Sequence, residues 1–88
     1  NSKQELIKIL DALIEEKKLS KRNSELLKIK KSLLIFDSAT ENQMLELLDV
    51  SNKNSFFRKT GLQILYDFHL SKNQKIKAEE VKRLIDEN

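Results

Sequence analysis

The sequence predicts an all-α fold, a compact bundle of four to five short helices. The chain contains no proline and only one glycine, it is rich in leucine, lysine and glutamate, and its apolar residues recur at helical spacing. No segment shows the apolar–polar alternation of a strand. Because the breaks between the apolar segments are short, neighbouring helices must pack together, as a bundle or in the manner of armadillo or HEAT repeats.

The first two predicted helices lie in the N-terminal half. The first covers "NSKQELIKILDALIEEKK", in which Ser2 and Glu5 have the spacing of a capping box. Its expected core stripe is Leu6, Leu10, Leu13 and Ile14, with Ile7 and Ile9 beside it. After the polar break "LSKRN", a second helix is predicted from about Ser24. Its apolar positions are Leu26, Leu27, Ile29, Leu33, Leu34 and Phe36.

The third and fourth predicted helices flank the turn "DVSNKN". The third runs from about Glu41 to Asp49, and Thr40 with Gln43 can form a capping box before it. The fourth runs from about Ser55 to Leu70, with Phe57, Gly61, Ile64, Leu65 and Phe68 on one face. Glycine inside a helix costs about 1 kcal/mol relative to alanine. Gly61 therefore predicts the close approach of a neighbouring helix.

A fifth helix is predicted over residues 78–87, from Ala78 to Glu87. Its apolar face is thin, consisting of Val81, Leu84 and Ile85, so we expect looser docking than for the other helices. His69 is expected to be a polar residue near the end of the fourth helix, where a positive charge interacts favourably with the helix dipole. We assign it no functional role.

Composition narrows the function mainly by exclusion. The 88 residues make one helical domain, 1–88, which we expect to be excised from a longer protein because the chain begins without methionine. With one histidine, no cysteine and no glycine-rich phosphate loop, we expect no enzyme, no metal site and no cofactor. The longest apolar run, "SLLIF", is too short for a membrane span. We expect an intracellular location, nuclear or cytoplasmic.

The segment from Lys17 to Lys31 has the strongest charge asymmetry, with Glu25 as its only acid. Its basic residues are Lys17, Lys18, Lys21, Arg22, Lys28, Lys30 and Lys31. Such a cluster can contact nucleic-acid phosphates. However, no aromatic residue is interleaved for base stacking, and the net charge of the chain is only +3. Nucleic-acid binding is therefore the alternative hypothesis, and a solvated surface is the simpler interpretation.

The stretch "SNKNSFFRK" predicts a partner-binding surface. Phe57 lies in register with the core face of its helix, whereas Phe56 lies about 100° away around the axis and need not be buried. Arg58 and Lys59 occupy the first turns, where the helix dipole disfavours cations. Their position suggests that they pair with an acidic group, either Asp49 or a carboxylate of a partner.

The segment "LELLDVSNKNSFFRK" resembles the third-helix region of the N-terminal domain of transcription elongation factor S-II. Relatives of that domain occur in elongin A, Mediator and the integrase-binding domain of LEDGF. The order Val50, Asn54, Phe57, Arg58, Lys59 matches, and "ELLKIKKSLLIFDSAT" is similar to the second helix of the family. The closing Trp-Lys of the family is absent, with "YDFHL" in its place. The resemblance implies a non-enzymatic bundle that docks short acidic motifs with an apolar anchor.

The leading hypothesis is thus a protein-interaction module, monomeric in isolation, that docks an acidic and hydrophobic peptide in transcription or chromatin regulation. The predicted binding residues are Phe56, Arg58 and Lys59, with Lys21 and Arg22 as electrostatic support. Apolar residues that do not fit the core stripes, such as Ile9, Ile35 and Leu70, could line a shallow groove. A structural or self-association role is the third hypothesis.

Overall fold

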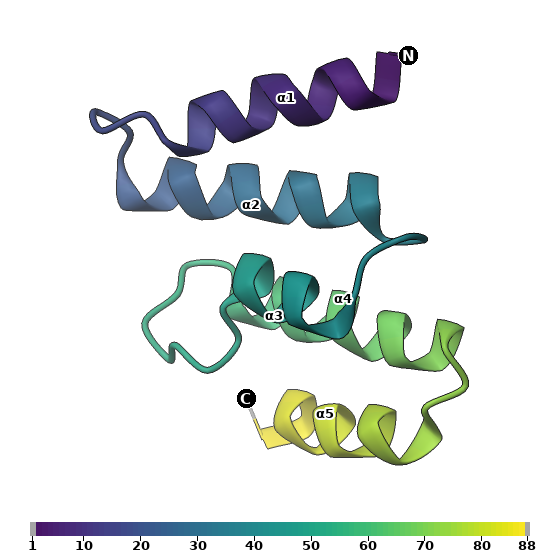
Figure 1. The fold of residues 1–88 in the computed structure, drawn as a ribbon. Coiled ribbons are helices and arrows are strands. Elements are labelled where there is room, and N and C mark those ends of the chain that lie inside the picture. Colours follow the sequence, from purple (N-terminus) through teal and green to yellow (C-terminus); the bar gives the residue numbers. More distant parts are fainter. Residues whose placement is uncertain (1, 88) are drawn as a thin grey trace.

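The computed structural model describes residues 2–87, and this part of the chain is all-α, as the sequence predicts (Figure 1). It has no strand. Its five helices are α1 (Ser2–Ile14), α2 (Lys21–Ile35), α3 (Glu41–Leu48), α4 (Arg58–Ser71) and α5 (Lys75–Glu87). None of these helices has the length and apolar character needed to cross a membrane.

Each helix packs mainly on the next one in the sequence. The main contacts join α1 to α2, α2 to α3, α3 to α4 and α4 to α5, so the helices follow one another across the molecule (Figure 1). The result is a flat body of 36 × 31 × 15 Å. A body this thin exposes much surface for its volume, and many apolar side chains can be only partly covered.

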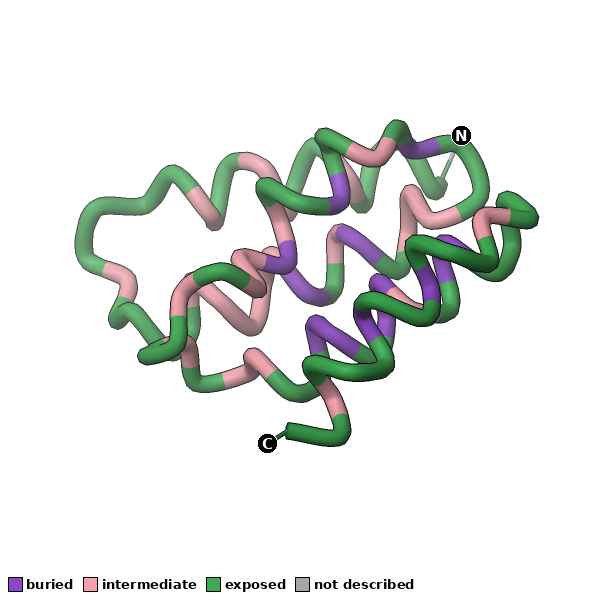
Figure 2. The backbone as a smooth tube through the Cα atoms, turned by 90° about the horizontal axis from the view of Figure 1, so that it is seen from below, coloured by how far each residue is buried: buried purple, intermediate pink, exposed green. Residues whose placement is uncertain are grey.

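The hydrophobic core lies in the middle of this body and is centred on α4 (Figure 2). Phe68 packs edge-on against Phe36 with ring centroids 5.6 Å apart. The buried core residues are Ile29, Ala39, Met44, Leu48, Leu62, Ile64, Leu65, Phe68 and Val81. No residue of α1 belongs to this cluster, so α1 is a peripheral layer carried by α2.

The apolar stripe predicted for α1 is partly wrong. Leu10 and Ile14 are half-buried with Ile7, but Leu6 and Leu13 are exposed together with Ile9. Positions 7, 10 and 14 form one helical stripe, and positions 6, 9 and 13 form another about 100° around the axis. Both stripes have helical spacing, so the pattern alone cannot decide which one faces α2. The structure leaves the second stripe uncovered.

Local hydrogen bonds explain where α2 and α3 begin. Ser20 caps α2 by accepting a 3.1 Å bond from the Asn23 backbone N–H, so α2 starts three residues before the predicted Ser24. The capping box predicted for α3 is confirmed. The Gln43 N–H donates to Thr40 Oγ1 at 3.2 Å, and the Thr40 N–H donates to Gln43 Oε1 at 2.9 Å.

The junction of α4 and α5 gives His69 a structural role. This side chain is only 3% exposed, and its Nδ1 lies 2.9 Å from Gln74 Oε1. The Gln74 N–H also donates to the His69 carbonyl at 2.9 Å, while Asn73 takes the left-handed conformation that closes the turn. His69 is therefore a polar residue in the last turn of α4, as expected, and it is in addition buried and fixes the turn.

α5 packs on α4 more extensively than its thin apolar face suggested. It starts at Lys75, three residues before the predicted Ala78, and forms the largest helix–helix interface of the fold with α4. Ala78 and Val81 are buried in it. Ala78 explains the difference, because a small side chain lets two helices approach closely without adding to an apolar pattern. Leu84, expected on the same face, is largely exposed.

Gly61 permits the close approach that the sequence predicts. A Cβ atom at this position would lie 3.0 Å from the Leu48 carbonyl oxygen and 3.3 Å from Val50 Cγ1. The Leu48 oxygen belongs to the backbone at the end of α3 and cannot rotate away. Glycine thus sets how closely the N-terminal part of α4 lies to the end of α3.

We expect Gly61→Ala to destabilise the fold although alanine is the better helix former. Crowding of the added methyl group lowers the free energy of unfolding by about 1–3 kcal/mol. The better helix propensity of alanine raises it by about 1 kcal/mol. The free energy of unfolding should therefore fall by about 1 kcal/mol in denaturation followed by circular dichroism. Thr60→Ala, at the exposed neighbouring position, is the control. Stabilisation by Gly61→Ala would show that the approach is not tight.

Candidate functional site

The loop between α3 and α4, residues 49–57, is ordered by its own Asx residues. Asp49 ends α3 in the left-handed conformation, with φ of 46°. Its carboxylate accepts a 3.2 Å bond from Asn52 Nδ2, and Asn52 Oδ1 accepts a 2.9 Å bond from the Asn54 N–H. Asn and Asp favour such turns because their short side chains bond to nearby backbone. These bonds delay the start of α4 from the predicted Ser55 to Arg58.

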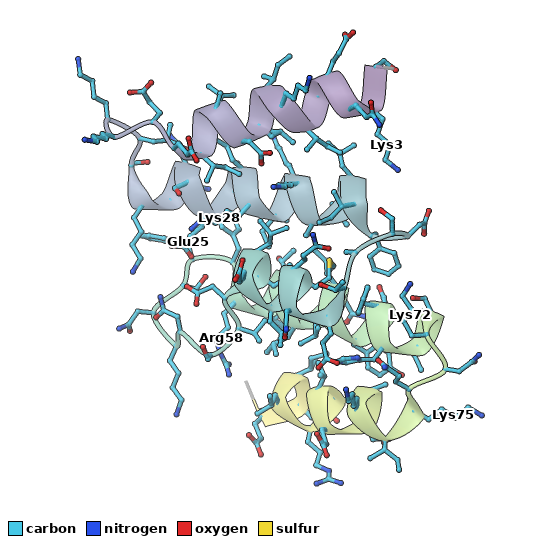
Figure 3. All side chains as sticks on the ribbon, in the orientation of Figure 1. Lys3, Glu25, Lys28, Arg58, Lys72 and Lys75 are labelled. Carbon is cyan, nitrogen blue, oxygen red and sulfur yellow. The ribbon has the colours of Figure 1, made fainter. Side chains whose placement is uncertain are left out.

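Glu25 ties this loop to α2. Its Oε1 accepts hydrogen bonds from the Ser55 hydroxyl and from the Phe56 N–H, the latter at 3.0 Å (Figure 3). Its Oε2 is buried without a hydrogen-bond partner in the described structure. The sequence indicates only that Glu25 is the single acid in a basic segment. In the structure this carboxylate holds the loop that carries the predicted binding residues.

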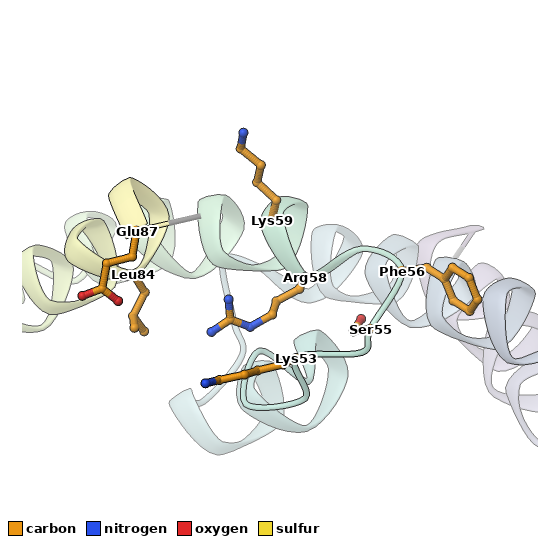
Figure 4. Close-up of a pocket in the computed structure, with 7 residues that line it drawn as sticks. All are labelled: Lys53, Ser55, Phe56, Arg58, Lys59, Leu84 and Glu87. Atoms are coloured by element: carbon orange, nitrogen blue, oxygen red, sulfur yellow. The ribbon is translucent and has the colours of Figure 1, made fainter.

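A cavity of about 500 Å³ lies where the loop, the start of α4 and the end of α5 meet. In Figure 4, Lys53 and Arg58 point toward the end of α5, whereas Phe56 points the opposite way and Lys59 points outward. Its lining residues are Lys53, Ser55, Phe56, Arg58, Lys59, Leu84 and Glu87. The structure therefore brings together Phe56, Arg58 and Lys59, which the sequence predicts as binding residues.

The two adjacent phenylalanines take different roles, as expected. Phe57 is half-buried and packs against the core, whereas Phe56 is 60% exposed at the rim of the cavity. Arg58 is held in place because its Nε donates a 2.7 Å bond to the Val50 carbonyl. This bond fixes the direction of the guanidinium and places its charge beside the loop.

Lys21 and Arg22, predicted as electrostatic support, do not line this cavity. Both are exposed at the start of α2. The Arg22 guanidinium lies 5.4 Å from the centroid of the Phe57 ring, a cation–π contact that covers a core aromatic residue. Arg22 thus contributes to packing beside the loop.

The basic segment 17–31 does not form one cationic face. Lys31 bonds to Asp11 at 2.5 Å, which joins α2 to α1. Lys28 is half-buried beside Glu25 (Figure 3). Lys21 and Lys30 are nine residues apart on α2, which places them on opposite sides of the helix at about 100° per residue. Lys17 and Lys18 lie in the turn before α2.

Leu84 and Glu87 are site residues that the sequence did not indicate. Leu84 is predicted as part of the apolar face of the fifth helix, and Glu87 only as the last residue of that helix. Only the antiparallel return of α5 along α4 brings them to a loop about thirty residues earlier in the chain (Figure 1). No local sequence pattern carries that information.

A second charged contact lies apart from the cavity. Lys77 Nζ on α5 is 2.6 Å from Glu41 Oε1 at the start of α3. The hydrogen bond from Lys77 lowers the pKa of the Glu41 carboxyl below its ordinary value of 4.5. Residues 2–87 contain no group of three or more His, Cys, Asp or Glu side chains placed to hold a metal ion.

Comparison with protein-family models, with curated proteins and with solved structures yields no match for this chain. The resemblance to the elongation-factor domain therefore rests on the quoted residues alone.

We expect Glu25→Ala to loosen the loop without unfolding the domain. Loss of a charged acceptor for two hydrogen bonds should lower the free energy of unfolding by about 1.5–3 kcal/mol. The amide of Phe56 should then exchange its hydrogen faster, as measured by NMR or mass spectrometry. Glu15→Ala, which removes an exposed acid from the turn after α1, should leave that exchange unchanged. Equal exchange rates in both variants would show that Glu25 does not hold the loop.

Proposed function

We propose that this domain is a non-catalytic interaction module that docks a short acidic peptide with an apolar anchor. The observation that carries the proposal is the cavity at the loop, α4 and α5, which is lined by three basic side chains and two exposed apolar side chains. The basic residues are Lys53, Arg58 and Lys59, and the apolar ones are Phe56 and Leu84. A site of this composition suits a ligand that combines carboxylates with an aromatic or aliphatic residue.

The start of α4 adds to the attraction for a carboxylate. Its N-cap residue, Phe57, makes no side-chain capping bond. The first backbone N–H groups of a helix have no partner within the helix, and the helix dipole places partial positive charge there. Together with Lys59 on the first turn, this helix end supports the acidic character of the proposed ligand.

Phe56 supplies the largest apolar contact available at the site. Its backbone N–H is fixed by Glu25, while its ring is 60% exposed. An aromatic side chain on a fixed backbone loses little conformational freedom on binding, which is why aromatic residues often dominate interface energies. Leu84 on α5 offers a second apolar surface across the cavity.

The biological setting follows from the resemblance to the elongation-factor domain. On that ground we propose partners among disordered acidic segments of transcription or chromatin proteins, and an intracellular, nuclear location. Arg58 and Lys59, which match the Arg-Lys of the family pattern, line the cavity.

The proposal is tested by titrating the domain with the acetylated, amidated peptide Ser-Phe-Asp-Glu-Leu-Ser-Ser and following amide resonances. We expect Phe56→Ala to weaken binding about tenfold by removing the aromatic contact. Lys53→Ser and Lys59→Ser should each weaken it about twofold or more at low salt, since exposed charges contribute modestly. Lys30→Ser, an exposed lysine of α2 outside the cavity, is the matched control.

Two results would overturn this proposal. If Phe56→Ala unfolds the domain, the ring belongs to the core and is not a docking surface. If Lys30→Ser weakens binding as much as Lys53→Ser, the acidic peptide is attracted to basic residues over the whole surface, and the cavity is not its binding site. Binding of a short DNA duplex with a steep salt dependence, lost on replacing Lys17, Lys18 and Lys21, would favour the nucleic-acid alternative.

Self-association is a second candidate, favoured by the outer face of α1. Leu6, Ile9 and Leu13 are 49%, 56% and 43% exposed and share one side of this helix. We expect a weak association, because three side chains cover far less area than a stable dimer interface needs. Sedimentation over a range of concentrations should show it, and Ile9→Glu should abolish it while Lys8→Glu should not. A concentration-independent monomer would eliminate this candidate.

A further inference from the structure

We propose that Glu87 makes the cavity selective for a bipolar peptide, in which an apolar residue separates the acidic segment from a basic residue. This inference rests on the function proposed above and specifies its ligand. Among residues 2–87, Glu87 is the only acidic residue that lines the cavity. The cavity therefore has a cationic end at the loop and an anionic end at α5.

The order of groups across the cavity supports this charge pattern. Phe56 lies at one end, Lys53 and Arg58 point inward from the loop, and Leu84 and Glu87 lie together at the far end (Figure 4). Leu84 and Glu87 are three residues apart on α5 and so share one side of that helix. An apolar ligand residue placed on Leu84 therefore brings the next ligand residue close to Glu87.

This arrangement favours a negative ligand charge at the cationic end of the cavity and disfavours it at the anionic end. A ligand carboxylate near Lys53 and Lys59 is attracted, whereas a carboxylate near Glu87 meets a like charge. Specificity often depends on such a repulsive element as much as on the attractive contacts. Because Glu87 is exposed, the effect is a discrimination of a few fold and is weakened by salt.

Three peptides of nearly equal size distinguish the possibilities. The reference is acetyl-Ser-Phe-Asp-Glu-Leu-Ser-Ser-amide. The second carries lysine after leucine, as Ser-Phe-Asp-Glu-Leu-Lys-Ser, and the third carries it before phenylalanine, as Lys-Phe-Asp-Glu-Leu-Ser-Ser. The two lysine peptides have the same composition and net charge, so a difference between them reports position alone. Each is titrated against the wild-type domain, Glu87→Gln and the control Asp86→Asn.

We expect the wild-type domain to bind the peptide with lysine after leucine about threefold more tightly than its isomer at low salt. Asp86→Asn should keep this preference, because Asp86 does not line the cavity. Glu87→Gln should reduce it, because only the repulsion between the N-terminal lysine of the isomer and the basic residues at the loop then remains. Equal binding of the two isomers by the wild-type domain overturns the inference, as does a preference that Glu87→Gln leaves undiminished.

A uniform gain in affinity for all three peptides on Glu87→Gln would also overturn it, since Glu87 would then only neutralise the basic side chains. The inference and the underlying function fail in different ways. If the peptides bind and Lys53→Ser weakens them without any positional preference, only the inference is wrong. If none of the three peptides shifts the resonances of residues 53–59, the proposed docking function itself is wrong.

Discussion

The close approach of α4 to the end of α3 at Gly61 is the contact around which the loop 49–57 and the cavity are arranged. The Leu48 carbonyl oxygen lies 3.0 Å from where a Cβ would be, so glycine lets the two helices come this close. The Asx hydrogen bonds of the loop then set where α4 begins. Glu25 then fixes the end of that loop through the Phe56 N–H. The loop and the first turn of α4 carry the cationic and aromatic groups of the cavity, so the positions of these groups depend on the approach at Gly61 and on the bonds to Glu25.

Burial of apolar side chains, rather than ion pairing, supplies most of the stability of this fold. The core joins α2 to α5 through Phe68, Met44, Leu62 and their neighbours, each fully or almost fully buried. The Lys77–Glu41 and Lys31–Asp11 pairs lie at partly exposed positions, where ion pairs contribute about 0–1 kcal/mol. The cavity thus lies on elements held by the core. α1, outside the core, is the layer that can be perturbed without altering the cavity.

The sequence predicted the all-α class, all five helices, the Thr40–Gln43 capping box and the close approach at Gly61, because each has a local pattern with a physical cause. It also separated Phe56 from Phe57, although both precede α4, so their different burial follows from the path of the loop and not from an angle on the helix. It could not choose between the two apolar stripes of α1, because both have helical spacing. Nor could it anticipate Glu25 as the anchor of the loop, the burial of His69, or Leu84 and Glu87 in the cavity. These depend on which distant segments meet, and that is decided by the packing of whole helices.

We propose that recognition occurs at the cavity between the loop and α5 and not along the basic segment of α2. The most direct measurement is amide chemical-shift mapping of the wild-type domain with the reference peptide and, separately, with a short DNA duplex. We expect the peptide to shift resonances in 53–59 and 84–87 together, two segments that lie far apart in the sequence but line one cavity. Shifts confined to 17–31, or a response to DNA alone, would contradict it.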